Sequence, residues 1–201
     1  MTRLACRGTR MNRVLLAALL SSAIPLPVSA ALPQGAAAPD FTTQASLAGK
    51  EFTFALKDAL KKGPVVVYFY PAAYTGGCNV QAHTFAENID KFSAAGATVI
   101  GVSLDKIATL NEFSADPEYC AGKLPVASDP EGRIAKSYDL TVQEARPGMK
   151  NTRGMEIDHG FAERTTFIVT PNGKVAATVG GVSPRENVEK TLELVQQLAG
   201  G

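Results

Sequence analysis

The sequence predicts an α/β sandwich in which helices flank a central mixed β-sheet. Two runs of β-branched and aromatic residues, 65–70 and 98–103, have the continuous apolar character of strands that are buried on both faces. Each run is followed by a segment whose apolar residues recur at helical spacing. A hairpin pattern over 165–179 and an amphipathic segment over 186–198 close the chain. This order of elements is typical of a mixed sheet between helices.

The composition indicates one globular domain. The chain has 201 residues, of which 45% are hydrophobic and 19% are charged, so it can bury a core and is too apolar for a disordered chain. Lys and Arg number 20 against 19 Asp and Glu, and no basic run is present. We therefore expect no nucleic-acid partner, because such proteins carry a basic excess or patch.

The first 30 residues have the layout of a secretory signal peptide. Arginines without any acid come first, an apolar stretch follows from Val14 to Ile24, and small residues end at Ala30. A membrane-spanning helix needs about 20 apolar residues, so we expect no stable membrane anchor, with an anchor as the alternative. Cleavage near Ala30 would make the protein periplasmic or secreted. Met11 is an alternative start to Met1.

The mature chain is predicted to open with a flexible lead-in over 31–39, which is rich in Ala and Pro, before a folded domain over 40–199. Short β-like segments surround a turn near Gly49. Pro71 ends the strand at 65–70, and a helix begins after Gly76 and Gly77. One face of that helix carries apolar side chains at steps of three and four residues: Cys78, Ala82, Phe85, Ile89 and Phe92.

The remaining elements follow in order. The spacing of Ile107, Leu110 and Phe113 predicts a helix over 105–115. Turn residues at 170–173 lie between two strand-like runs. The other expectations are a short strand at 124–127, a short helix at 133–138, a long loop at 141–161, hairpin strands at 165–169 and 174–179, and a final helix whose buried face carries Val188, Leu192, Val195 and either Leu198 or Ala199.

Cys78 is the first candidate for chemistry. It lies after a buried strand and a loop, in the first turn of the predicted helix. Unpaired amide groups and the positive end of the helix dipole favour a thiolate over a thiol there. The alternative is a small buried apolar residue, since free cysteines are commonly buried. Removal of residues 1–30 leaves Cys78 and Cys120 as the two thiols, which suggests a pair.

The segment from Pro71 to Cys78 has the pattern P-x-x-x-T-x-x-C directly after a buried strand. It resembles the active-site loop of the peroxiredoxins, which are thiol peroxidases on a thioredoxin-like fold, and the likeness runs from Phe41 to Leu198. The YFYP opening and the C-x-x-Q-A step are most similar to the Q-type branch, also called bacterioferritin-comigratory proteins.

The resemblance implies a role for several residues. Cys78 would attack the peroxide and become a sulfenic acid. Thr75 can hydrogen bond to the sulfur or to a peroxide oxygen, and Pro71 can shield the loop without offering a competing donor. Arg164 matches the family's arginine, which would polarise the peroxide; taken alone, it would be a surface charge at a strand end. Weaker candidates for that charge are Arg146 and Arg153, and Gln81 is either a supporting residue or an exposed one.

Where the common Q-type pattern has a resolving cysteine, five residues after the first, this chain has His83. Cys120 matches the later position that some members of the branch use, and local unfolding would bring Cys78 to it. The alternative is a single-cysteine enzyme with Cys120 merely buried. The loop at 141–161 leads straight into Arg164, so we expect it to border the site.

Two other classes of protein stay open as alternatives. A copper-binding chaperone of thioredoxin-like fold would use C-x-x-x-C with a distant histidine; His83 and His159 are present, but Cys78 has no second cysteine nearby. A non-catalytic redox sensor would use the same two thiols. We expect no metal and no other cofactor, a peroxide substrate, a thioredoxin-like or glutaredoxin-like reductant, and a monomer or a dimer.

Overall fold

The computed structural model describes residues 1–2 and 31–200. The expected signal peptide over 1–30 lies, apart from its first two residues, outside the described residues, and so does Met11. Of the helices within the described part of the chain, none combines the length and the apolar character that a membrane crossing requires.

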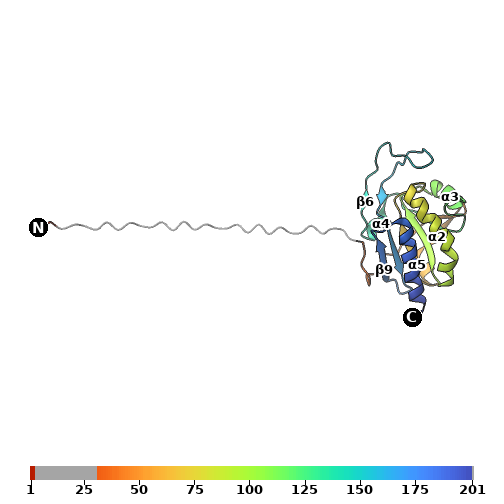
Figure 1. Cartoon of the computed structure of the whole chain (residues 1–201), viewed down its shortest axis with the longest axis horizontal. Helices are drawn as coiled ribbons and strands as arrows, with labels where there is room; N and C mark the ends of the chain where they lie inside the picture. The colour runs from red at the N-terminus through yellow and green to blue at the C-terminus, as the bar shows by residue number, and fades with distance from the viewer. Residues whose placement is uncertain (3–30, 201) are drawn as a thin grey trace.

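A mixed sheet forms the centre of the described domain (Figure 1), as the sequence predicts. Its strand order is β2-β1-β5-β4-β3-β8-β9. β3 is parallel to β4, and β4 to β5, whereas the other neighbours are antiparallel. The strands of this sheet are β1 (Thr42–Leu47), β2 (Lys50–Ala55), β3 (Val65–Phe69), β4 (Thr98–Ser103), β5 (Val126–Ser128), β8 (Thr165–Val169) and β9 (Val175–Gly180).

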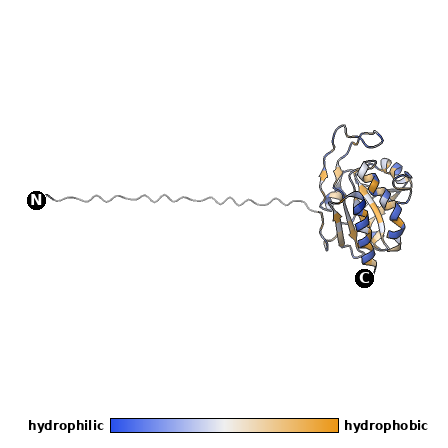
Figure 2. Cartoon of the chain, in the orientation of Figure 1, coloured by the Kyte–Doolittle hydropathy of each residue, from blue (hydrophilic) through white to orange (hydrophobic). Residues whose placement is uncertain are grey.

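Helices cover both faces of the sheet. They are α1 (Leu56–Leu60), α2 (Gly76–Ala94), α3 (Ile107–Ala115), α4 (Arg133–Ser137) and α5 (Pro184–Gly200). Alternate side chains of β3 point to opposite faces: Val66 and Tyr68 join a cluster with α2, α3 and α5, while Val67 and Phe69 join another with α1 and α4. Figure 1 shows α2 and α5 side by side, and Figure 2 shows apolar strands behind helices with polar outer faces.

The buried face of α5 differs from the predicted one. Leu198, expected on that face, is 44% exposed. Asn187 and Thr191 are buried instead, together with Val188 and Val195. Polar side chains can occupy this face because both are hydrogen bonded within the fold.

The ends of the long loop at 141–161 are paired. β6 (Val142–Gln143) and β7 (Phe161–Ala162) form a separate antiparallel pair. The amide of Glu163 also donates to the carbonyl of Thr141 at 2.9 Å. The loop therefore leaves and re-enters the fold at one place, immediately before β8.

The segment at 31–39, which the sequence predicts to be a flexible lead-in, runs beside the start of β9. The amide of Gly35 donates to the carbonyl of Val175 at 2.8 Å, and the amide of Val175 donates to Ala36 at 2.9 Å. The Thr178 hydroxyl also donates to the carbonyl of Leu32. These contacts attach the segment to β9.

Candidate active site

Cys78 is the third residue of α2 and lies beyond the end of β3, as the sequence predicts. The side chain is buried, with 2% of the residue exposed. The first four amides of a helix have no partner within the helix, and the dipole is positive at this end. The position therefore favours negative charge on the sulfur.

Arg164 supplies a full positive charge at the same place. It directly precedes β8, and Thr165 of β8 pairs with Phe69 at the end of β3. This register brings Arg164 to the sheet edge from which the Cys78 segment begins. The Nη2 of Arg164 donates a hydrogen bond to the Sγ of Cys78 at 3.3 Å. A cationic donor at this distance stabilises a thiolate and the charge that develops on a peroxide.

A second nitrogen of the same guanidinium is held by Gln81, one turn further along α2. The Nη1 of Arg164 donates to the Oε1 of Gln81, which is fully buried. Of the two interpretations that the sequence leaves open for Gln81, the structure therefore supports the one in which it contacts the site. The guanidinium of Arg164 therefore donates both to the sulfur of Cys78 and to the amide oxygen of Gln81.

Thr75 directly precedes α2, and its hydroxyl donates to the carbonyl of Ala72 at 2.9 Å. The hydroxyl proton is therefore not directed at the sulfur of Cys78, which is one of the two roles expected for it. Its oxygen keeps lone pairs that can accept a hydrogen bond from a substrate. Pro71 lies half-buried after Tyr70, where the chain leaves β3.

The loop at 141–161 borders this segment, as expected. Tyr74 is fully buried and has φ of 57°, which a residue with a side chain rarely adopts. The amide and the hydroxyl of Thr152 both donate to the carbonyl of Tyr74, at 2.8 and 2.9 Å. Contacts from the loop therefore support the strained residue that precedes Thr75.

A buried carboxylate fixes the segment from the other side. The Oδ2 of Asp105 accepts from the amide of Ala73 at 2.8 Å and from the Ser103 hydroxyl at 2.7 Å. Its Oδ1 lies 3.0 Å from the Nε2 of His159, in the long loop. Burial alone would lower the pKa of His159, but the hydrogen bond and the charge of Asp105 outweigh it, so the pKa is raised above its ordinary 6.5.

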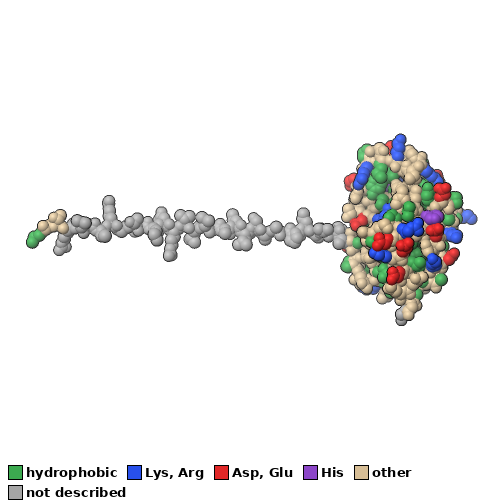
Figure 3. All heavy atoms as spheres, in the orientation of Figure 1, with side chains coloured by type: hydrophobic (Ala, Val, Ile, Leu, Met, Phe, Trp, Pro, Cys, Tyr) green, Lys and Arg blue, Asp and Glu red, His purple; other side chains and the backbone are tan. Residues whose placement is uncertain are grey.

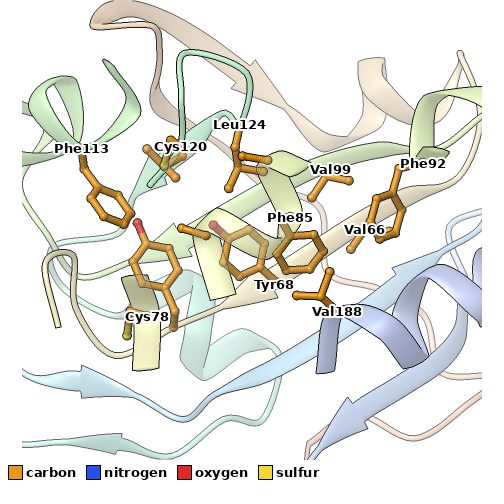
Figure 4. Close-up of a cluster of buried hydrophobic side chains, with 14 of the residues drawn as sticks. Val66, Tyr68, Cys78, Phe85, Phe92, Val99, Phe113, Cys120, Leu124 and Val188 are labelled. Carbon is orange, nitrogen blue, oxygen red and sulfur yellow. The ribbon is translucent and has the colours of Figure 1, made fainter. Parts of the chain in front are cut away.

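Cys120 lies after α3, fully buried in the same cluster of side chains as Cys78. Figure 4 shows the two cysteines on different sides of that cluster, which also contains Tyr68 and Phe113. Both are free thiols in this conformation. Burial raises the pKa of the Cys120 thiol, and the charge of Asp116 raises it further. The thiol is thus kept protonated while it stays in the cluster.

The other basic candidates have different partners. Arg146 donates to Gln143 and is exposed, and Arg153 lies over the ring of Tyr74. His83 contacts the carbonyl of Glu118 and the carboxylate of Glu87. In the part of the chain that the structure describes, no three side chains of the metal-binding types gather into a ligand set.

Asn187 and Thr166 carry no motif in the sequence that marks them as functional, although both are connected to Gln81. The Nε2 of Gln81 donates to the Oδ1 of Asn187 at 2.9 Å, and the Thr166 hydroxyl donates to the same oxygen at 2.6 Å. One cue was available: Asn187 and Thr191 are polar residues four apart, beside the apolar face of a predicted helix.

On the face drawn in Figure 3, acidic and basic side chains are interspersed.

Known proteins resemble the chain in sequence. Residues 34–178 match the AhpC/TSA family. The chain is 32% identical to the chloroplastic peroxiredoxin Q of Oryza sativa subsp. japonica, over 90% of this chain and 81% of the rice protein. It is 30% identical to the chloroplastic peroxiredoxin Q of Populus jackii, over 89% of this chain and 75% of that protein.

Solved structures resemble the chain in fold. Peroxidoxin BcpB from Mycobacterium tuberculosis is 25% identical, with a TM-score of 0.68, over 83% of this chain and 98% of that one. Peroxiredoxin Q from Xanthomonas campestris is also 25% identical, with a TM-score of 0.61, over 78% of this chain and 90% of that one. These likenesses confirm the expected thioredoxin-like fold and the resemblance to the Q-type branch.

Proposed function

The chain belongs to the AhpC/TSA family and is a peroxiredoxin, a thiol peroxidase that resembles the Q type, and on this premise we propose that Cys78 attacks the peroxide and Cys120 resolves the product. The observation that carries the first half is the hydrogen bond from Arg164 to the Sγ of Cys78, at the start of α2. A helix end and a guanidinium act together there on one sulfur.

In the first step, the Cys78 thiolate attacks one peroxide oxygen and the O–O bond breaks. The other oxygen leaves with a proton as water or an alcohol, and Cys78 becomes a sulfenic acid. Arg164 stabilises the charge on the departing oxygen. Thr75 accepts a hydrogen bond from the peroxide, because its own proton is engaged with the Ala72 carbonyl. Pro71 shields the segment.

In the second step, Cys120 attacks the sulfenic sulfur, water leaves, and a Cys78–Cys120 disulfide forms. The raised pKa of the buried Cys120 thiol opposes this attack within the cluster. Resolution therefore requires local unfolding around the first turn of α2 and the segment after α3, which exposes both sulfurs. A thioredoxin-like or glutaredoxin-like dithiol then returns the pair to thiols and is itself oxidised to a disulfide.

Both hydrogen peroxide and organic hydroperoxides are proposed as substrates. Support for the second class comes from the bacterioferritin comigratory protein of Xanthomonas campestris, which is 25% identical to this chain and is described by its alkyl peroxide reduction activity. The signal-like pattern over 1–30 supports export, so we place the reaction in the periplasm or outside the cell.

The test is the intact mass of the reduced protein without residues 1–30, before and after one equivalent of hydrogen peroxide. The unsubstituted protein should lose both thiols and about 2 Da, whereas Cys120→Ser should gain about 16 Da and stop there. Cys78→Ser should not react quickly. If the unsubstituted protein gains about 16 Da without forming a disulfide, Cys120 is not the resolving thiol, and if Cys78→Ser reacts as fast as the parent, Cys78 is not the attacking one.

A further inference from the structure

The side-chain amide of Asn187 is buried, and both its oxygen and its nitrogen are hydrogen bonded. Its Oδ1 accepts from the Nε2 of Gln81 at 2.9 Å and from the Thr166 hydroxyl at 2.6 Å. Its Nδ2 donates to the backbone carbonyl of Val179, in β9, at 2.9 Å. Only 1% of Asn187 is exposed, and Gln81 is fully buried, so water does not compete for these groups.

These bonds fix the direction of each amide in turn. A backbone carbonyl can only accept, so the nitrogen of Asn187 must face Val179 and its oxygen must face Gln81. That oxygen can also only accept, so Gln81 turns its nitrogen toward Asn187. The oxygen of Gln81 is then left on the side of Arg164, whose guanidinium offers donors alone.

We propose that Asn187 is a positioning residue, which fixes the amide of Gln81 and through it aims Arg164 at Cys78. The proposal rests on the peroxidase function given above. Through Asn187, it makes α5 a support of the reacting centre. The backbone carbonyl of Val179 fixes the orientation of the Asn187 amide, which in turn fixes that of the Gln81 amide.

Loss of Asn187 would remove the reason for Gln81 to keep this orientation. With the amide of Gln81 turned over, its NH2 group would face the guanidinium of Arg164, donor against donor, in a buried place. Arg164 would then move away to find another acceptor. The bond from its Nη2 to the sulfur of Cys78 would lengthen or break.

The experiment compares the effect of Asn187→Leu in the parent with its effect in a Gln81→Glu background, all in the Cys120→Ser protein without residues 1–30, so that Cys78 is the single thiol. Glutamate has an oxygen at both terminal positions, so Arg164 meets an acceptor whichever way the side chain turns. Thr191→Val is the matched control: Thr191 is also fully buried on α5, but its hydroxyl donates to the backbone carbonyl of Asn187 and not to the side-chain amide that contacts Gln81. Melting temperatures check folding, and Asn187→Ala replaces the leucine variant if that one does not fold.

Two readouts are taken, the rate constant of Cys78 with hydrogen peroxide and the pH profile of its alkylation by iodoacetamide. Asn187→Leu should lower the rate constant about tenfold and move the midpoint of the alkylation profile to higher pH, as loss of a charge-assisted hydrogen bond would. In the Gln81→Glu background, Asn187→Leu should change either readout by less than about twofold. Thr191→Val should change neither.

Equal losses from Asn187→Leu in both backgrounds would overturn the proposal, because a merely structural defect does not depend on residue 81. An unchanged rate and pH profile in Asn187→Leu would overturn it as well. The alkylation profile needs no peroxidase activity. If Cys78 proves unreactive toward peroxide, the proposed function fails while the relation between Asn187 and the Cys78 thiolate is still measured.

Discussion

The guanidinium carbon of Arg153 lies 3.6 Å from the centroid of the Tyr74 ring. The same guanidinium pairs with Glu112 of α3 at 2.9 Å and with Asp116 at 2.7 Å. Arg153 thereby connects the long loop, the segment that precedes Cys78 and the chain that leads to Cys120. We therefore expect the local unfolding proposed for disulfide formation to break these contacts.

Arg153→Met should therefore speed disulfide formation. A cation–π contact contributes about 0.5–2 kcal/mol and ion pairs of a partly exposed arginine contribute less, so we expect an increase of about fivefold. Rapid quenching followed by intact mass measures the conversion of sulfenic acid to disulfide. Lys106→Met is the matched control, since Lys106 pairs with Asp158 of the same loop at an exposed site. A slower or unchanged conversion in Arg153→Met would contradict this account.

Arg164→Met should lower the rate constant of Cys78 with hydrogen peroxide by about 100-fold to 1,000-fold. It removes the donor to the sulfur and the charge that stabilises the departing oxygen, and the loss of one such donor has about this effect in other enzymes. Competition against a peroxidase of known rate measures it. Arg146→Met, which replaces an exposed arginine bonded to Gln143, should leave the rate unchanged. Similar rates in the two variants would show that Arg164 does not act on the sulfur.

Gly77→Ala tests the same contact by sterics. A Cβ at Gly77 would lie 3.1 Å from the Nη2 of Arg164 and 3.3 Å from Pro184, so the flexible guanidinium must shift by a few tenths of an ångström. We expect the peroxide rate to fall about fivefold with little change in stability. Gly76→Ala is the control, because a Cβ there meets nothing within 4 Å. If both alanine variants keep the parent's rate, the position of Arg164 is not critical.

The pair between His159 and Asp105 predicts a pH-dependent stability. The folded pKa of His159 is raised above its ordinary 6.5, so the contribution of the pair is fully present below pH 6.5 and is lost as the pH rises through the folded value. The free energy of unfolding of the parent should exceed that of His159→Gln by about 1–2 kcal/mol near pH 6. The difference should shrink toward pH 9.

Urea unfolding at several pH values measures this difference. His83→Gln is the control, because the His83 side chain is 46% exposed and its pairing with Glu87 is screened by solvent. A difference between the parent and His159→Gln that stays constant with pH would show that the imidazolium charge does not stabilise the fold.

The elements that carry the site could be predicted because they follow local rules. The strand at 65–70 and the helix after Gly77 are set by hydrophobic pattern and by turn residues, and they appear as β3 and α2. The family pattern from Pro71 to Cys78 then led to Arg164, far along the chain. The bond from Arg164 to Cys78 agrees with that inference.

The supporting contacts could not be predicted, because each depends on segments that meet only in the folded chain. Nothing near Asn187 in the sequence indicates that its amide meets Gln81 and β9. The φ of Tyr74 would ordinarily favour glycine, and it is supported by Thr152 from the long loop. The predicted buried face of α5 was wrong at Leu198, which lies in the exposed last turn of the helix, and it missed Asn187 and Thr191, whose burial depends on hydrogen bonds within the fold.

We propose that this fold makes Cys78 a fast peroxide-reactive thiolate. We would measure the second-order rate constant of Cys78 with hydrogen peroxide at neutral pH in the Cys120→Ser protein without residues 1–30, so that Cys78 is its single thiol. We predict a rate constant on the order of 1,000-fold or more above that of free cysteine. A value equal to that of free cysteine, with the protein folded, would show that the site does not activate Cys78.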